Sequence, residues 1–98
     1  MPYAFTQDVP ADAEMYAEIR ALLPTDPPAG LINHVVIEQE RGLRYVDVWE
    51  TETDWETFRD EVVEPAVGQV LAGYGLPHDH SLVTFQPVSV VDVWLRST

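Results

Sequence analysis

The chain of 98 residues contains no cysteine and no lysine. Without cysteine, disulfide bonds, thiolate nucleophiles and cysteine-based zinc sites are excluded. No apolar run approaches the roughly 20 residues that a membrane-spanning helix needs. The start of the chain also lacks the basic and apolar segments of a secretory signal peptide. We therefore expect a cytoplasmic protein that neither crosses nor binds a membrane.

The charge of the chain is strongly one-sided. Seventeen acidic residues stand against five arginines, which gives a formal net charge of −12. Nucleic-acid binding requires clustered cations that release counterions from phosphates, so we expect no nucleic-acid partner. Apolar residues make up 46% of the chain and are spread along it, which is typical of a folded domain. The length predicts one domain over residues 1–98.

Apolar residues recur along the chain with the period of a strand or of a helix. We predict a strand, a helix, two strands joined by a tight turn, a helix and a last strand. Their ranges are 3–9, 12–23, 31–39, 43–49, 53–73 and 82–95.

Two prolines and one capping motif mark the second half of the chain. The run Thr53-Asp54-Trp55-Glu56 has the form of a capping box, in which the threonine oxygen accepts a backbone N–H. Pro65 lies inside the same helix, and we expect a kink or break near residues 62–65 because proline has no N–H to donate. Pro87 is expected to interrupt the last strand between residues 82–85 and 88–95.

The order β-α-β-β-α-β predicts an α+β, ferredoxin-like fold, with two helices on one face of a four-stranded antiparallel sheet. The other face must also be covered, because neither face of the strands is polar. In the strand 43–49, Val46 and Val48 lie on one side, and Tyr45 and Trp49 lie on the other. We therefore expect a homodimer that packs sheet face against sheet face.

The run Tyr45-Val46-Asp47-Val48-Trp49-Glu50 and the acidic, aromatic helix start Thr53-Asp54-Trp55-Glu56-Thr57-Phe58 resemble the dimeric α/β-barrel superfamily. Within it, they are similar to the antibiotic-biosynthesis-monooxygenase-like (ABM-like) domains. The resemblance covers nearly the whole chain. It implies a homodimer, no metal or organic cofactor, and a small aromatic molecule as partner. Members include cofactor-independent quinone-forming oxygenases, haem-degrading enzymes, isomerases or cyclases, and proteins of unassigned activity.

The resemblance carries over to some positions only. Trp49 at the end of its strand and Trp55 on the next helix match the quinone-forming enzymes in kind. Tyr45 stands where those enzymes have an asparagine. Haem-degrading members have a tryptophan on the second helix and a histidine about ten residues later. Phe58 and Gly68 occupy those positions, so haem degradation is not expected.

Tyr45, Asp47 and Trp49 share one face of the strand 43–49. Two aromatic walls with one acceptor are typical of a pocket for a flat ring, with Trp55 and Phe58 as further walls. The alternative is that Tyr45 and Trp49 are core or dimer-interface residues whose polar atoms are hydrogen-bonded.

The turn between the two middle strands decides which residue joins this face. A two-residue turn, Arg41-Gly42, places His34 opposite Trp49, whereas a three-residue turn places Asn33 there. His34 is the candidate base because imidazole titrates near neutral pH, and Asn33 is the candidate orienting group. A histidine that only completes the core or the interface is the alternative.

The run His78-Asp79-His80 invites a metal interpretation, because imidazoles bind zinc or nickel. A firm site needs a third or fourth ligand, and the neighbouring sequence offers none. We therefore interpret the run as an exposed polar loop and predict no metal site.

Two functions remain open. One is an enzyme that acts on a flat aromatic or polyketide-like substrate, with walls from Tyr45, Trp49, Trp55 and Phe58. In it Asp47 is an acceptor, and His34 or Asn33 handles or orients a proton. The other is a non-catalytic dimeric module that binds a ligand or a partner protein. An open cavity between sheet and helices favours the enzyme, and a packed interior around Trp49 favours the module.

Overall fold

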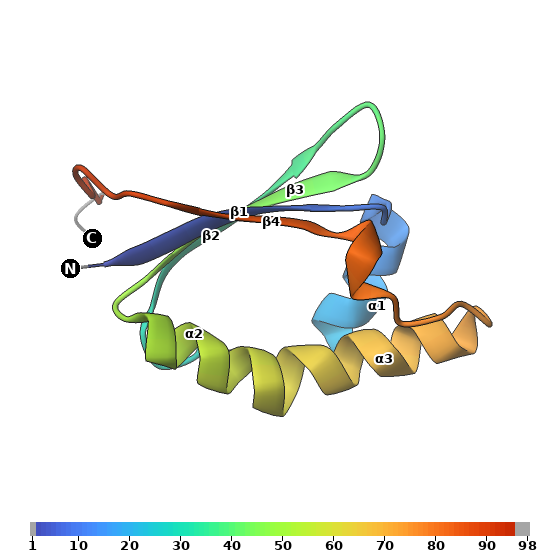
Figure 1. Cartoon of the computed structure of the whole chain (residues 1–98). Coiled ribbons are helices and arrows are strands. Elements are labelled where there is room, and N and C mark those ends of the chain that lie inside the picture. The colour runs from blue at the N-terminus through green and yellow to red at the C-terminus, as the bar shows by residue number, and fades with distance from the viewer. Residues whose placement is uncertain (1, 96–98) are drawn as a thin grey trace.

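The computed structural model describes residues 2–95, which fold into a four-stranded sheet with helices on one face (Figure 1). The strands are β1 (Tyr3–Val9), β2 (Leu31–Glu38), β3 (Leu43–Trp49) and β4 (Thr84–Val88). All neighbouring strands are antiparallel, in the order β2-β3-β1-β4. The predicted ferredoxin-like α+β fold is confirmed. No helix within the described residues is long and apolar enough to cross a membrane.

Two capped helical runs cover the sheet. Helix α1 (Ala13–Ala21) begins after Asp12, whose carboxylate accepts the Met15 N–H at 2.8 Å. The second run starts with α2 (Glu52–Phe58), and its cap is Thr51. The Thr51 hydroxyl accepts the Asp54 N–H at 3.1 Å. The prediction of a capping box at Thr53 was therefore wrong, because the helix begins two residues earlier than expected.

The second helical run is irregular just before its proline, as predicted. A π-helical segment, Arg59–Val63, separates α2 from α3 (Glu64–Gly73). At the end of this segment the Glu64 N–H donates to the Arg59 carbonyl, five residues back. Pro65 has no N–H to donate, so a wider turn relieves the crowding that proline imposes on the preceding turn. The chain continues as a helix instead of breaking.

The hairpin between β2 and β3 has a longer turn than either alternative predicted from the sequence. Glu38 pairs with Leu43, so four residues, 39–42, form the turn. His34 therefore lies opposite Asp47, whereas neither predicted register paired these two residues. Because the register differs by two residues from that of the two-residue turn, His34 keeps the expected face. A bulge between Leu31 and Asn33 ends this regular pairing.

The last strand is shorter than predicted. Strand β4 spans Thr84–Val88 and contains Pro87, which pairs with Phe5 of β1. Proline is tolerated here because β4 is an edge strand with a neighbour on one side only. The predicted extension over 88–95 was wrong, since residues 89–95 form no strand. Residue 82 belongs to a short 3₁₀ turn, His80–Leu82.

The two faces of the sheet have different surroundings. On the helical side, Phe5, Trp49 and Trp55 form a buried aromatic core. On the opposite face, the alternating residues Val35, Ile37 and Val88 remain exposed. The apolar second face inferred from the sequence is thus present, and no element of residues 2–95 covers these three side chains.

We predict that Gly42→Ala lowers the free energy of unfolding by at least about 2 kcal/mol in urea titrations. Gly42 has a φ of +88°, and a Cβ there would lie 2.1 Å from the Val9 carbonyl oxygen. The control is Gly73→Ala, whose added Cβ meets nothing within 4 Å and which should be neutral or slightly stabilising. Equal stabilities of the two variants would contradict this account of the turn.

Candidate functional site

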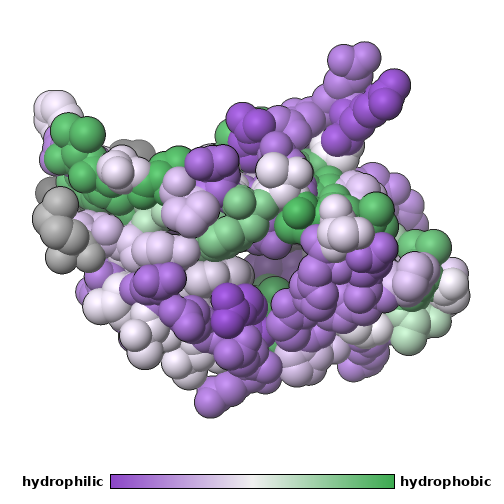
Figure 2. Space-filling view, in the orientation of Figure 1, coloured by the Kyte–Doolittle hydropathy of each residue, from purple (hydrophilic) through white to green (hydrophobic). Residues whose placement is uncertain are grey.

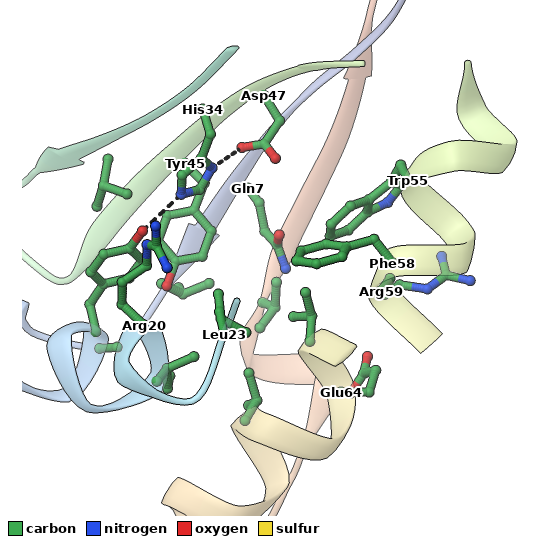
Figure 3. Close-up of a pocket in the computed structure, with 18 of the residues that line it drawn as sticks. Gln7, Arg20, Leu23, His34, Tyr45, Asp47, Trp55, Phe58, Arg59 and Glu64 are labelled. Atoms are coloured by element: carbon green, nitrogen blue, oxygen red, sulfur yellow. Dashed lines mark hydrogen bonds and ion pairs between the residues drawn. The ribbon is translucent and has the colours of Figure 1, made fainter. Parts of the chain in front are cut away.

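Four polar side chains form a continuous hydrogen-bonded chain on the helical face of the sheet. His34 Nδ1 lies 2.6 Å from Asp47 Oδ1, and His34 Nε2 lies 2.9 Å from the Tyr16 hydroxyl. The Trp49 indole N–H donates to Asp47 Oδ2 at 3.1 Å. The chain of hydrogen bonds therefore runs from Tyr16 on α1 through His34 and Asp47 to Trp49 at the end of β3. Figure 3 shows its His34–Asp47 part.

The pairing of β2 with β3 positions this chain. His34 and Asp47 are directly opposed, and Asp47 and Trp49 are two residues apart on one face of β3. An ionised carboxylate only accepts hydrogen bonds, so His34 Nδ1–H donates to Asp47. In the neutral imidazole, Nε2 is then the acceptor and takes the Tyr16 O–H. This arrangement orients a base toward α1.

The carboxylate is buried and the imidazole is accessible. Asp47 is only 4% exposed, whereas the His34 side chain is 29% exposed. Tyr45 packs beside them, with its ring centre 5.7 Å from that of His34 and 5.6 Å from that of Tyr16. Burial raises the pKa of the Tyr45 hydroxyl to about 12, and Tyr16 and Asp47 add to this rise. Burial also raises the pKa of Tyr16, so both phenols stay protonated at neutral pH.

A cavity of about 1250 Å³ lies between the sheet and the helices. Figure 2 shows the molecule hollowed there, with hydrophilic residues around the opening. In the close-up, His34 and Tyr45 lie on one side of the cavity, and Trp55 and Phe58 lie on the other (Figure 3). The volume exceeds what a drug-sized ligand needs.

The aromatic residues of α2 pack on Trp49 at the far wall of this cavity. The Trp49 ring centre lies 5.6 Å from those of both Trp55 and Phe58. Trp49 is 1% exposed and Trp55 is 7% exposed, so both also belong to the core. The Trp55 Nε1–H is buried, and no side chain or backbone group of residues 2–95 accepts it. Such an unsatisfied donor is rare and points to an acceptor supplied from outside the chain.

The predicted site residues are therefore brought together in two groups. His34, Asp47 and Tyr45 form one group, and Trp49, which bonds Asp47, joins it to the second group of Trp55 and Phe58. Asn33 borders the cavity but pairs with Val48, whose side chain points to the opposite face. The structure thus pairs His34, and not Asn33, with Asp47.

Tyr16, Arg20 and Gln7 are among the cavity residues that were not predicted from the sequence. Tyr16 lies three residues before the buried Ile19, and this helical spacing was the available signal. Gln7 pairs with Tyr45 across β1 and β3. The loop histidines 78 and 80 also border the cavity, and their neighbour there is Glu64, which was not predicted from the sequence.

Comparisons with known proteins bear on the fold. No family model matches the sequence, and no curated protein matches it significantly. Among solved structures, Rv0793 from Mycobacterium tuberculosis aligns with a TM-score of 0.62 at 17% identity, over 95% of this chain and 98% of that one. A candidate antibiotic biosynthesis monooxygenase from Deinococcus radiodurans aligns with a TM-score of 0.54 at 15% identity, over the full length of both chains. The chain therefore shares the fold of these two structures.

We predict that Asp47→Ala lowers the free energy of unfolding by about 1–3 kcal/mol, since it leaves the buried Trp49 indole N–H without an acceptor. Urea denaturation measures the loss, and the indole proton resonance of Trp49 should shift. The control is Asp8→Ala, which removes an exposed carboxylate that pairs with Arg44 on the other face of the sheet. It should change stability little. Similar losses in both variants would argue against a supporting role for Asp47.

Proposed function

We propose that the chain is a small-molecule enzyme that resembles the cofactor-independent monooxygenases and acts on a flat aromatic or polyketide-like substrate. The observation that carries the proposal is the His34–Asp47 pair on the wall of a large aromatic cavity. A histidine whose Nδ1–H is held by a buried carboxylate presents Nε2 as the proton acceptor, and in this chain Nε2 contacts the Tyr16 hydroxyl. The fold is similar to that of a candidate antibiotic biosynthesis monooxygenase, and this similarity supports a monooxygenase reaction.

In the proposed reaction, His34 accepts the phenolic proton of the substrate, either directly or through the Tyr16 hydroxyl that it already contacts. Asp47 orients the imidazole and stabilises its protonated form. The electron-rich phenolate then reduces molecular oxygen. A phenol and O₂ give a quinone and one water, so one oxygen atom enters the ring and the other leaves as water. The protein deprotonates, orients and excludes bulk water.

The unsatisfied indole of Trp55 supports a ligand that carries an oxygen acceptor. Trp55 Nε1–H is buried on the wall opposite His34. A planar ligand that reaches across the cavity could place a carbonyl or hydroxyl oxygen there while its other end meets His34. Tyr45 and Phe58 would contact its faces and edges, because aromatic walls suit flat rings.

The test is aerobic incubation with hydroquinones and polycyclic phenols, followed by oxygen uptake and quinone absorbance. His34→Gln should lower kcat by about 100-fold or more, as loss of a general base does. Trp55→Phe should raise KM more than it lowers kcat, because it removes a contact to the ligand. Asp8→Ala, on the opposite face, should keep the wild-type rate. If His34→Ala and Trp49→Phe both left turnover unchanged, the assignment of the active site to this cavity would be wrong.

The alternative function is a non-catalytic module that binds a ligand or a partner. The burial of Trp49 favours it, since this residue is 1% exposed and its indole is already hydrogen-bonded to Asp47. A module of this kind would quench its tryptophan fluorescence on binding a phenol and consume no oxygen. The same phenols therefore separate the two functions in one experiment.

We also propose that two copies of the chain pack through the outward face of the sheet. Val35, Ile37 and Val88 are each 44–45% exposed there, and the segment after β4 exposes Val91 by 97% and Trp94 by 94%. Apolar surface of this extent is unfavourable in water and is usually covered. A second copy covers it symmetrically.

We predict that the wild-type protein elutes with twice its monomer mass of 11.1 kDa in size-exclusion chromatography with light scattering. The double variant Val35→Glu, Ile37→Glu should be a monomer, because dimerisation would bury its carboxylates. Leu22→Glu is the matched control, since Leu22 is also 44% exposed but lies at the end of α1. A monomeric wild type, or a dimeric double variant, would refute this interface.

A further inference from the structure

A second cluster of polar side chains lies at the rim of the cavity, away from His34. His78 Nε2 is 2.9 Å from one carboxylate oxygen of Glu64, and His80 Nε2 is 3.0 Å from the other. One ligand atom from each of the three residues lies within 4.8 Å of the others, and the two imidazole rings are 4.6 Å apart. All three residues border the cavity.

The fold brings these residues together from two segments. Glu64 is the first residue of α3, directly after the π-helical segment, and the histidines lie in the loop that returns to β4. Asp79 between them is extended, so the side chains at 78 and 80 lean to the same side. The Asp79 carboxylate instead accepts the Ser81 N–H and hydroxyl, at 2.9 and 2.6 Å. The third member of the cluster is therefore Glu64 and not Asp79.

Two imidazoles and one carboxylate form a donor set that suits a divalent transition metal. Zinc binds histidine nitrogen and carboxylate oxygen at about 2.0–2.2 Å, so two ligand atoms in a tetrahedral site lie about 3.3 Å apart. The observed nitrogen–oxygen separations of 2.9 and 3.0 Å need only small side-chain rotations to reach that arrangement. Nickel and cobalt accept the same ligands, whereas calcium and magnesium prefer oxygen ligands alone.

We propose that Glu64, His78 and His80 bind a divalent transition metal, zinc foremost, at the cavity rim. Three protein ligands leave a coordination position for water or for an oxygen of a small molecule, as in zinc sites that are not purely structural. The metal would also tie the loop around residues 78–80 to the first turn of α3. This site shares no ligand with the His34–Asp47 pair, so the proposal goes beyond the enzyme proposed above and can be tested without any substrate.

The net charge of −12 attracts cations in general, and the experiment must separate that attraction from a built site. Zinc binding is measured by calorimetry in a millimolar excess of calcium, which occupies diffuse acidic surface. Cobalt is bound in parallel, because its visible absorption reports nitrogen ligands in a tetrahedral field. We expect one zinc per chain, a cobalt band of tetrahedral type, and a higher Tm with zinc, because a ligand that binds only the folded chain stabilises it.

Two single substitutions and two matched controls test the ligands. His80→Gln and Glu64→Gln should each weaken zinc binding by at least about tenfold and remove the zinc-dependent rise in Tm. Glu61→Gln, an exposed carboxylate three residues earlier, and His34→Gln, the remaining histidine, should bind zinc as the wild type does. His80 is 69% exposed, so its replacement is compatible with folding even if Glu64→Gln proves unstable.

The proposal fails if zinc binding is abolished by calcium, or if His80→Gln and Glu64→Gln keep wild-type affinity. It also fails if His34→Gln is the variant that loses zinc, since the metal then belongs to the other site. If the cluster serves only as an ion pair, its substitutions change Tm equally with and without zinc. None of these results depends on whether a phenol is oxidised, so the outcome is distinct from that of the proposed function.

Discussion

The buried carboxylate of Asp47 imposes the strictest demand in the described structure. A charge that is removed from water must be matched by donors, and the inner face of the sheet offers two, the imidazole of His34 and the indole of Trp49. The indole lies two residues from Asp47 on the same strand, whereas the imidazole meets Asp47 only if β2 and β3 pair in the observed register. The orientation of the candidate base therefore follows from that pairing, and the position of Trp49 follows from the alternation of side chains along β3.

The register also determines which side chains meet the cavity. The strand bearing Asp47 presents Tyr45 and Trp49 to the helices, and its partner presents His34. Trp49 has two roles at once, because it fills the core and holds the carboxylate. The sequence left open whether Trp49 belongs to a pocket or to the core, and in the structure it belongs to both. Trp49 and Trp55 pack in the buried core and also line the open cavity.

Features set by neighbouring residues could be predicted from the sequence, and features set by distant ones could not. Alternation of apolar residues located β3 to the residue, and the chemistry of Pro65 located the irregular helical segment. The cap at Thr51 was missed because two threonines with similar followers lie two residues apart. The extent of β4 was missed because residues 89–95 have strand-like composition but no neighbouring strand among the described residues. The contacts of Tyr16 with His34, and of Glu64 with two loop histidines, span 14 residues or more, and no local pattern encodes them.

The four-residue hairpin turn has a consequence for how the chain tolerates changes of length. Side chains on a strand alternate, so a turn shortened or lengthened by one residue would rotate His34 to the outward face and leave Asp47 buried without its imidazole. A change of two residues would slide one strand along the other and keep every side chain on its original face. The effect of an insertion or deletion at this hairpin therefore does not simply grow with its size: a one-residue change exchanges the two faces of β2, whereas a two-residue change keeps the faces and moves His34 away from Asp47 along the strand.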